Sequence, residues 1–262
     1  MSKISPHAII EDGAVIGENV EIGAFCFISS ESTIGDGTTI AHAACIYGKT
    51  TIGKNNRIFS HAVLGSIPQD LKFNGEDVEL IIGDNNTIRE FTLLNPGTEG
   101  GGSKTIVGNN NLLMGYVHLG HDVIVGNNCI IANSAGIAGH VEIGNNVVIG
   151  AGGTGVHQFC KIGDYAMVGA ASALTQDVPP FCMAEGNRAT LRGLNINGLR
   201  RHMERSDINE IKLAYRKLFE SGQPLKDTAN EILQNTENNY VKDICNFAIE
   251  TKRGIPYERK TK

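Results

Sequence analysis

The chain has 262 residues, a formal net charge of −5 at pH 7 and 19% charged residues, enough for one large domain or a domain with an appendage. It contains no run of 18 apolar residues and no basic and apolar leader, so we expect neither a membrane span nor a secretory signal. Six cysteines are scattered without a Cys-x-x-Cys pair. This argues against a zinc ribbon or a disulfide framework, and it predicts a cytoplasmic protein.

The charge is unevenly distributed along the chain. Residues 1–186 contain 8 Lys/Arg against 18 Asp/Glu, and residues 187–262 contain 15 against 10, which gives −10 and +5. A basic C-terminal region favours an acidic partner docking there. A solvated helical surface explains the same charges.

From the N-terminus an isoleucine or leucine recurs at every sixth residue, at positions 4, 10, 16, 22, 28, 34, 40, 46, 52, 58 and 64. A period of six matches neither a helix nor an ordinary strand, and it indicates the stacked coils of a β-helix. We call these periodic positions the rungs. The residue four positions after each rung is small or β-branched, and Asn56 is the exception. Cys26, Cys129 and Cys160 occupy this small-residue site, so we expect them to be buried packing residues.

The rhythm is interrupted twice, at residues 65–79 and 95–106, by polar segments rich in glycine and containing proline. We predict that both are loops ejected from the coil, here called the first and second excursions. Insertions in a solenoid gather on one face, and that face is often the binding face.

The period then holds from Val107 to Ile149, and this stretch carries His118, His121, Asp122 and His140. If three six-residue steps make one turn, positions 18 apart stack. His121 then lies beside Gly139, and Asp122 lies under His140. Strand alternation predicts that His118 and His121 point outward and are exposed. An outward histidine beside a carboxylate favours a general base, whereas three histidines on a β-helix favour a zinc site.

After Ile149 the next periodic apolar residue is Val156, seven residues later instead of six, and the six-residue period then continues to Leu174. The glycine-rich run Gly150-Ala-Gly-Gly-Thr-Gly is expected to absorb the extra residue as a bulge before Val156. From residue 187 the pattern becomes helical. Ser206 is predicted to cap a helix that ends at Ser221-Gly222, a second helix starts near Pro224, and a third precedes Gly254. We therefore predict a β-helix domain over 1–186 and an α-helical domain over 187–262.

Several motifs together resemble the acyl-carrier-protein–UDP-N-acetylglucosamine O-acyltransferase family of lipid A biosynthesis. The motifs are Ile67-Pro-Gln-Asp-Leu-Lys72, Asn111-Leu-Leu-Met, His118-Leu-Gly-His-Asp122, Ala138-Gly-His140, Val156-His-Gln-Phe159, Gln176-Asp-Val-Pro-Pro180, Glu185-Gly-Asn-Arg-Ala189 and Gly193-Leu-Asn-Ile-Asn-Gly-Leu-Arg-Arg201. The resemblance covers nearly the whole chain. It implies an all-β left-handed parallel β-helix with a C-terminal α-helical domain, assembled as a homotrimer.

The resemblance also implies a reaction and its residues. A 3-hydroxyacyl chain would move from acyl carrier protein to the sugar 3-position of UDP-N-acetylglucosamine, without cofactor, metal or nucleic acid. His121 would be the general base, Asp122 its orienting partner and the N–H of Gly139 the oxyanion donor. The implied substrate-binding residues are Gln69, Asp70, Lys72, His118, His140, Gln158, Asn195 and Arg201, and those of the acyl groove are His157, Ala170 and Arg188.

Departures from the family pattern are the extra residue within 150–155, Asn197 and His202 in the tail signature, and Ala170 where a glycine is often found. Three rivals stay open. The related N-acyltransferase of the same pathway carries an extra domain before its repeats, whereas here the repeats start at Ile4. A γ-carbonic-anhydrase-like enzyme would bind zinc through histidines, and a plain scaffold would have no need of His121, Asp122 or the excursions. Two acceptors also stay open, a 3-hydroxyl sugar and a 3-amino sugar.

Overall fold

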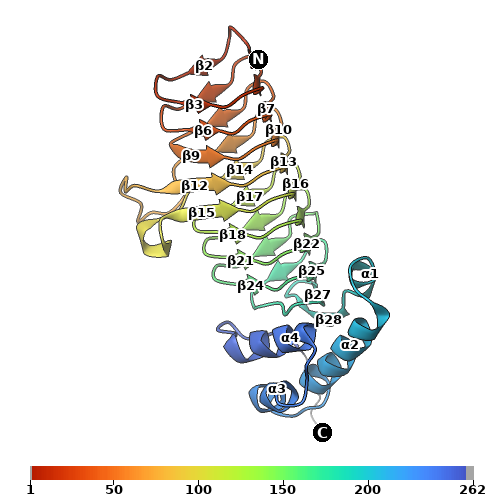
Figure 1. Cartoon of the computed structure of the whole chain (residues 1–262). Helices are drawn as coiled ribbons and strands as arrows, with labels where there is room; N and C mark the ends of the chain where they lie inside the picture. The colour runs from red at the N-terminus through yellow and green to blue at the C-terminus, as the bar shows by residue number, and fades with distance from the viewer. Residues whose placement is uncertain (1, 258–262) are drawn as a thin grey trace.

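The six-residue steps build a tube of three parallel sheets in the computed structural model, which describes residues 2–257 (Figure 1). Sheet A contains β1 (Lys3–Ile4), β4 (Glu21–Ile22), β7 (Thr39–Ile40), β10 (Arg57–Ile58), β13 (Thr87–Ile88), β16 (Leu112–Leu113), β19 (Ile130–Ile131), β22 (Val148–Ile149), β25 (Met167–Val168), β27 (Cys182–Glu185) and β28 (Thr190–Leu194).

Sheet B contains β2 (Ile9–Ile10), β5 (Phe27–Ile28), β8 (Cys45–Ile46), β11 (Val63–Leu64), β14 (Leu93–Leu94), β17 (His118–Leu119), β20 (Gly136–Ile137), β23 (Gly155–Val156) and β26 (Ala173–Leu174). Sheet C contains β3 (Val15–Ile16), β6 (Thr33–Ile34), β9 (Lys49–Ile52), β12 (Glu79–Ile82), β15 (Lys104–Val107), β18 (Ile124–Val125), β21 (Glu142–Ile143) and β24 (Lys161–Ile162). We name each corner by the two sheets it joins: AB, BC and CA.

The predicted stacking period is confirmed by the strand register. Ile4 pairs with Ile22 and Ile131 pairs with Ile149, so one coil takes 18 residues. The second residue of each two-residue strand points into the tube, and from Ile22 onward these rungs are at most 3% exposed. The core is therefore a single column of aliphatic side chains, continuous because each coil covers the last.

Asn56 breaks the pattern of small apolar residues because it begins a buried asparagine ladder at the CA corner. Its side-chain nitrogen donates to the carbonyl of Gly83 at 2.8 Å, and its side-chain oxygen accepts the N–H of Asn86 at 2.8 Å. Asn86 repeats this arrangement with the carbonyl of Gly108 and the N–H of Asn111. The amides thus satisfy main-chain groups at this corner.

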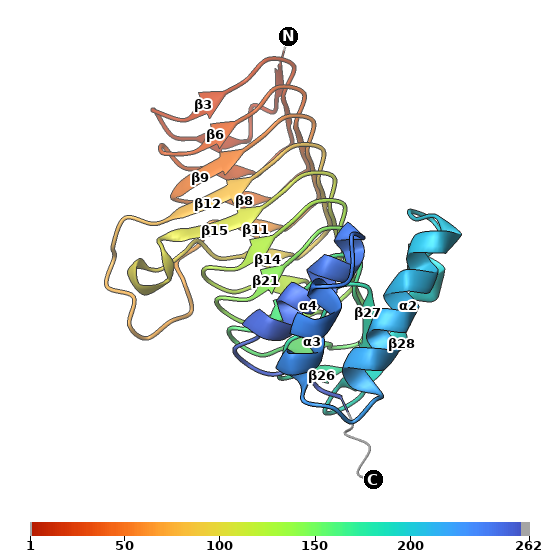
Figure 2. The same cartoon turned by 60° about the horizontal axis from the view of Figure 1, so that its bottom comes forward.

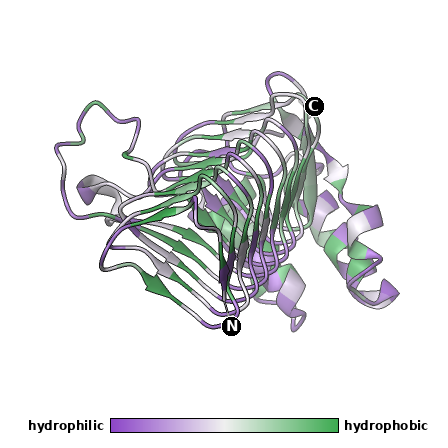
Figure 3. Ribbon diagram, turned by 90° about the horizontal axis from the view of Figure 1, so that it is seen from above, coloured by the Kyte–Doolittle hydropathy of each residue, from purple (hydrophilic) through white to green (hydrophobic). Residues whose placement is uncertain are grey.

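Both excursions leave the tube at the BC corner. The first connects β11 to β12, and the second connects β14 to β15 and contains the short 3-10 helix η1 (Glu99–Gly101). Figure 3 shows them projecting from one side of the tube, with the helical segment on another side. Asn95, at the start of the second excursion, donates to the carbonyls of Ser66 and Ile67 at 2.9 and 3.1 Å. The two loops are thus joined at their bases.

The extra residue near Gly150 is absorbed as predicted. Ile137 pairs with Val156, so this coil takes 19 residues, and the pairing of Ile143 with Ile162 keeps the same offset. Gly152 and Gly153 have φ of +83° and +75° at the AB corner, where glycine adopts the left-handed conformation without a Cβ clash. The inward column continues unbroken past the bulge.

The tube ends in an antiparallel pair, β27 with β28, before the chain becomes helical (Figure 2). The helices are α1 (Ile196–Leu199), α2 (Arg205–Phe219), α3 (Leu225–Leu233) and α4 (Asn239–Glu250). The predicted boundary at residue 187 falls in the turn between β27 and β28, and the two-domain division remains a prediction. The Ser206 cap is wrong, because Glu204 is the N-cap of α2 and no side chain caps it.

The C-terminal segment packs back against the tube at Asp177, which lies in the last coils. This buried carboxylate accepts the N–H of Lys161 at 2.8 Å and the hydroxyl of Thr251 at 2.6 Å. The contact fixes the helical segment to the last coils. Among residues 2–257, no helix is long and apolar enough to cross a bilayer.

Candidate active site

His121 and Asp122 lie together at the BC corner, in the connection between β17 and β18. Asp122 has φ of +59°, and its Oδ2 lies 2.8 Å from Nδ1 of His121. An acidic partner on Nδ1 favours the tautomer whose proton is on that nitrogen, which leaves the Nε2 lone pair free. The pair therefore has the hydrogen-bond arrangement of an oriented base.

The predicted stacking around this pair is also found. A Cβ added at Gly139 would lie 2.6 Å from Nε2 of His121, so the imidazole rests directly on a residue that has no side chain. The N–H of His140 donates to the carbonyl of His121, and Nδ1 of His140 lies 3.8 Å from Oδ2 of Asp122. Phe159 continues the column, with its ring stacked on His140 at 4.4 Å.

The two excursions cover the BC corner, so the expectation that His121 is exposed is wrong. His121 and Asp122 are only 8% and 5% exposed. Asp70 of the first excursion brings Oδ2 to 3.9 Å from Nε2 of His121. The second excursion covers Asp122, and a Cβ at Gly101 would overlap its carboxylate. Strand alternation sets the outward direction of His121, but loop packing sets its burial.

Thr98 is a site residue that the sequence did not reveal. Its N–H donates to Oδ1 of Asp122 at 2.9 Å and its hydroxyl to Oδ2 at 2.6 Å. It lies within the polar run Asn95-Pro-Gly-Thr-Glu, and no spacing relates it to the six-residue period. The only sequence signal was that a glycine-rich insertion stands one coil before the histidines.

Burial lowers the pKa of two histidines near the corner. Desolvation lowers the pKa of His118, and it lowers the pKa of His140 more than Asp122 raises it. His118 stands on the outer face of β17, in register with Leu93 and Gly136. No hydrogen bond or ion pair within residues 2–257 joins its ring to His121 or Asp122.

The residues predicted for the acyl groove lie across the outer face of sheet B. Gly136 and Gly155 are exposed on this face, and a Cβ at either position would meet no atom within 4 Å. His157 and Gln158 stand exposed where β23 ends, next to the BC corner, while Ala170 is exposed beside the bulge at the AB corner. The face between these corners is therefore shallow and lined by small residues.

The predicted C-terminal site residues lie elsewhere in the chain. Asn195 caps α1 and donates to the carbonyl of Tyr165 at 3.0 Å, which places it at the CA corner. Arg201 and Arg188 are exposed. Gln69 and Lys72 are exposed on the first excursion, and the N–H of Lys72 donates to Oδ1 of Asp70. A single chain thus brings together Asp70, His121, Asp122, Gly139 and His140, but not Asn195 or Arg201.

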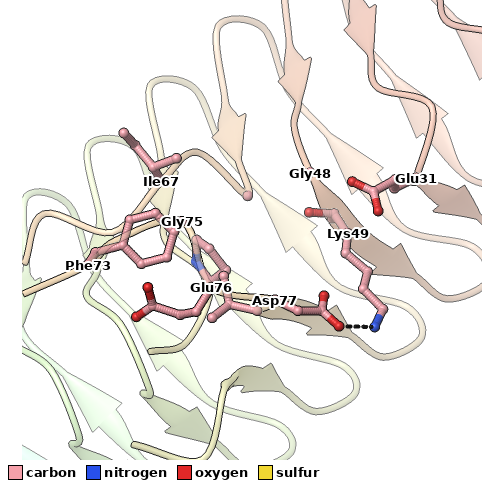
Figure 4. Close-up of a pocket in the computed structure, with 12 residues that line it drawn as sticks. Glu31, Gly48, Lys49, Ile67, Phe73, Gly75, Glu76 and Asp77 are labelled. Atoms are coloured by element: carbon pink, nitrogen blue, oxygen red, sulfur yellow. Dashed lines mark hydrogen bonds and ion pairs between the residues drawn. The ribbon is translucent and has the colours of Figure 1, made fainter. Parts of the chain in front are cut away.

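A hollow of about 590 Å³ lies at the base of the first excursion, away from His121. Figure 4 shows Phe73 and Glu76 on its excursion side and Lys49 on the tube side. The Lys49 amine lies 3.4 Å from Asp77 and 2.6 Å from Glu79. Its one lysine already has two carboxylate partners, so the candidate chemistry lies at His121 and Asp122 instead.

The possible metal-ligand atoms of His121, Asp122 and His140 lie within 4.8 Å of one another, so these residues form a candidate metal site. The Asp122 oxygens, however, already accept three hydrogen bonds, from Thr98 and His121. Direct ligation of a cation by Asp122 would compete with these bonds. The geometry therefore favours hydrogen-bonded orientation of His121 over zinc ligation.

Comparison with known proteins identifies relatives along the whole chain. Residues 177–256 match the family described as Udp N-acetylglucosamine O-acyltransferase, domain 2, and residues 104–139 match bacterial transferase hexapeptide repeats. An acyl-[acyl-carrier-protein]–UDP-N-acetylglucosamine O-acyltransferase of Sulfurimonas denitrificans is 74% identical over 99% of both chains. The enzyme of that name from a Sulfurovum species is 64% identical over 100% of both.

The solved structures agree. The UDP-N-acetylglucosamine acyltransferase from Campylobacter jejuni aligns with a TM-score of 0.94 and 45% identity, covering 98% of this chain and 100% of that one. The predicted fold is confirmed: the chain is a left-handed parallel β-helix of hexapeptide repeats with helices at its C-terminal end.

Proposed function

Because the chain belongs to the acyl-[acyl-carrier-protein]–UDP-N-acetylglucosamine O-acyltransferase family, we propose that it transfers a 3-hydroxyacyl chain to the sugar 3-hydroxyl of UDP-N-acetylglucosamine. The donor is the thioester of acyl carrier protein, and the reaction is the first step of lipid A biosynthesis. The observation that carries the mechanism is the His121 ring, which rests on Gly139 with Asp122 at Nδ1.

In this mechanism Nε2 of His121 takes the proton of the sugar hydroxyl as the oxygen attacks the thioester carbonyl. The tetrahedral oxyanion is stabilised by the N–H of Gly139, which makes no other hydrogen bond within residues 2–257. Collapse expels the carrier thiolate, which takes the proton from His121. Asp122 stays ionised and holds the imidazole in orientation.

One assay tests the reaction and separates the enzyme rivals. The purified protein is given 3-hydroxyacyl carrier proteins of several chain lengths, with either UDP-N-acetylglucosamine or its 3-amino analogue as acceptor. We expect ester formation on the 3-hydroxyl, with little amide formation. Preferred transfer to the amine would instead assign a 3-amino sugar as the acceptor, and zinc found by elemental analysis at one ion per chain would favour the metal enzyme.

The acyl chain is proposed to lie across the outer face of sheet B, from His121 toward the bulge and Ala170. Gly136 and Gly155 leave this face open, and the bulge keeps Val156 in register. Deleting Gly152 should therefore change the preferred chain length more than it lowers turnover of the best donor. A deletion variant that stays folded, keeps the same chain-length profile and only loses activity would contradict this groove.

Acyl carrier protein is proposed to dock on the basic C-terminal surface. Its cations are all exposed, and within residues 2–257 none forms an ion pair; they are Arg188, Arg192, Arg200, Arg201, Arg205, Lys212 and Arg216. Unpaired exposed cations attract an acidic partner, and salt screens that attraction. The KM for the carrier should therefore rise with ionic strength, and a flat response would count against this surface.

The homotrimer also remains a proposal, supported by the distribution of site residues. His121 lies at the BC corner and Asn195 at the CA corner, so one chain does not assemble both halves of the predicted sugar site. A neighbouring copy would complete it. Two inactive variants, His121→Ala and Arg201→Ala, should regain activity when co-assembled, and absence of rescue in a mixed oligomer would contradict a shared site.

A further inference from the structure

We infer that Thr98 is a positioning residue for the reaction, acting through Asp122 on the orientation of His121. This inference deepens the proposed function and rests on it. Thr98 lies 24 residues before Asp122 in the chain, in the second excursion rather than in the repeats. It is 7% exposed, so its polar groups are shielded from solvent by the same loop that covers Asp122.

Two donors of Thr98 hold the two carboxylate oxygens of Asp122 separately. The N–H reaches Oδ1 at 2.9 Å, and the hydroxyl reaches Oδ2 at 2.6 Å. Thr98 is also the N-cap residue of η1, yet its side chain makes no capping bond because its hydroxyl is directed to Asp122. The hydroxyl thus bonds to the Asp122 carboxylate instead of capping η1.

Oδ2 of Asp122 is shared by two donors, the hydroxyl of Thr98 and Nδ1 of His121. A carboxylate held on one side by Thr98 cannot rotate without lengthening its bond to the imidazole. Gly101 packs against the same carboxylate, and a Cβ at that position would overlap it. The direction of the Nδ1 bond, and with it the aim of Nε2, is therefore set partly by Thr98.

The second excursion supplies a matched control in Thr105, at its end on β15. Thr105 is buried, as Thr98 is, but its hydroxyl has no hydrogen-bond partner among residues 2–257. Replacing either threonine with valine keeps the shape and removes only the hydroxyl. The two variants therefore separate loss of the Asp122 contact from loss of a buried threonine in general.

The test is a double-mutant cycle with Thr98→Val, Asp122→Asn and the combination, measured as kcat and KM for both substrates. Thr98→Val should lower kcat roughly 10-fold to 100-fold, the size expected for losing a hydrogen bond to a charged group, and leave both KM values little changed. Thr98→Ser, which retains the hydroxyl, should retain most turnover. Thr105→Val should match the parent in kcat and be at least as heat-stable.

In the Asp122→Asn background the further effect of Thr98→Val should largely vanish, because residues that act as one unit are not additive. An undiminished effect there, or near-parent turnover of Thr98→Val when Asp122→Asn is impaired, would overturn the role of Thr98 while leaving the proposed reaction standing. Near-parent turnover of Asp122→Asn would overturn the orienting roles of both Asp122 and Thr98, and the proposed reaction would still stand. If the valine variant melts well below Thr105→Val, Thr98→Ala takes its place in the same cycle.

Discussion

Two corners of the tube solve the same backbone problem with different residues. At the CA corner the left-handed position is repeatedly asparagine, with φ between 55° and 59°, at Asn19, Asn55, Asn85, Asn110, Asn128 and Asn146. At the BC corner the corresponding residues are Asp122, His140 and Phe159, with φ between 59° and 64°. Asparagine adopts this conformation at low cost, whereas histidine and phenylalanine adopt it less readily.

The two corners also differ in the contacts that their side chains make. Residues that follow the CA turn point inward and form the buried ladder of Asn56, Asn86 and Asn111. Residues at the BC turn point their side chains at one another and at the excursions. The hydrogen bond between His121 and Asp122, rather than the backbone conformation alone, makes the BC turn the candidate site.

Removing the His121 side chain from the BC corner should have the largest effect on activity. His121→Ala removes the proposed base and should lower kcat/KM by 10²–10⁴-fold, or roughly 3–5 kcal/mol of activation free energy. His61→Ala, at the AB corner where the ring stacks on Phe91, is the matched control and should stay near the parent. More than about a tenth of parent activity in His121→Ala would remove this residue from the base role.

Breaking the inside of the CA corner should affect stability rather than chemistry. Asn86→Ala leaves the buried carbonyl of Gly108 and the N–H of Asn111 without their side-chain partners, at a cost of about 2–4 kcal/mol in unfolding free energy. Chemical denaturation measures this cost. Turnover per folded molecule should be unchanged, and a selective loss of kcat at full stability would contradict the division between the corners.

The outer asparagines of the CA corner should have a smaller effect. Asn128 has φ of +58°, so Asn128→Ala should destabilise by about 1 kcal/mol because alanine avoids the left-handed region. Asn128→Gly should be close to neutral. Equal stability of the alanine and glycine variants in denaturant titrations would show that backbone conformation does not explain the repeated asparagine.

The smallest expected effect is a pH dependence near the BC corner. Burial lowers the pKa of His118 in the folded chain, so the folded state binds fewer protons than the unfolded state, in which the histidine pKa is about 6.5. Burying the neutral His118 ring therefore does not lower the unfolding free energy above pH ~6.5. The unfolding free energy falls as the pH drops below that value, because the unfolded state then binds the proton more readily. His118→Gln should make the unfolding free energy less sensitive to acid over this range, and an unchanged slope would contradict this assignment.

Local rules explain why most of the fold was predictable and where the prediction failed. A period of six specifies which residues point inward, and counting 18 residues per coil places His121 beside Gly139 and Asp122 under His140. The same counting located the extra residue before Val156. The Ser206 cap failed because sequence offers several candidate caps, and the end of β28 and the short helix α1 determine where α2 begins.

The sequence by itself determined the repeat, the column of the candidate catalytic residues and the family resemblance, because these depend on spacing between residues on one rigid lattice. Only the tertiary structure decided the burial of His121, the approach of Asp70 and the two bonds from Thr98 to Asp122. These contacts come from excursions that have no period. Their conformation depends on packing against the corner and against each other, and no spacing rule along the chain encodes it.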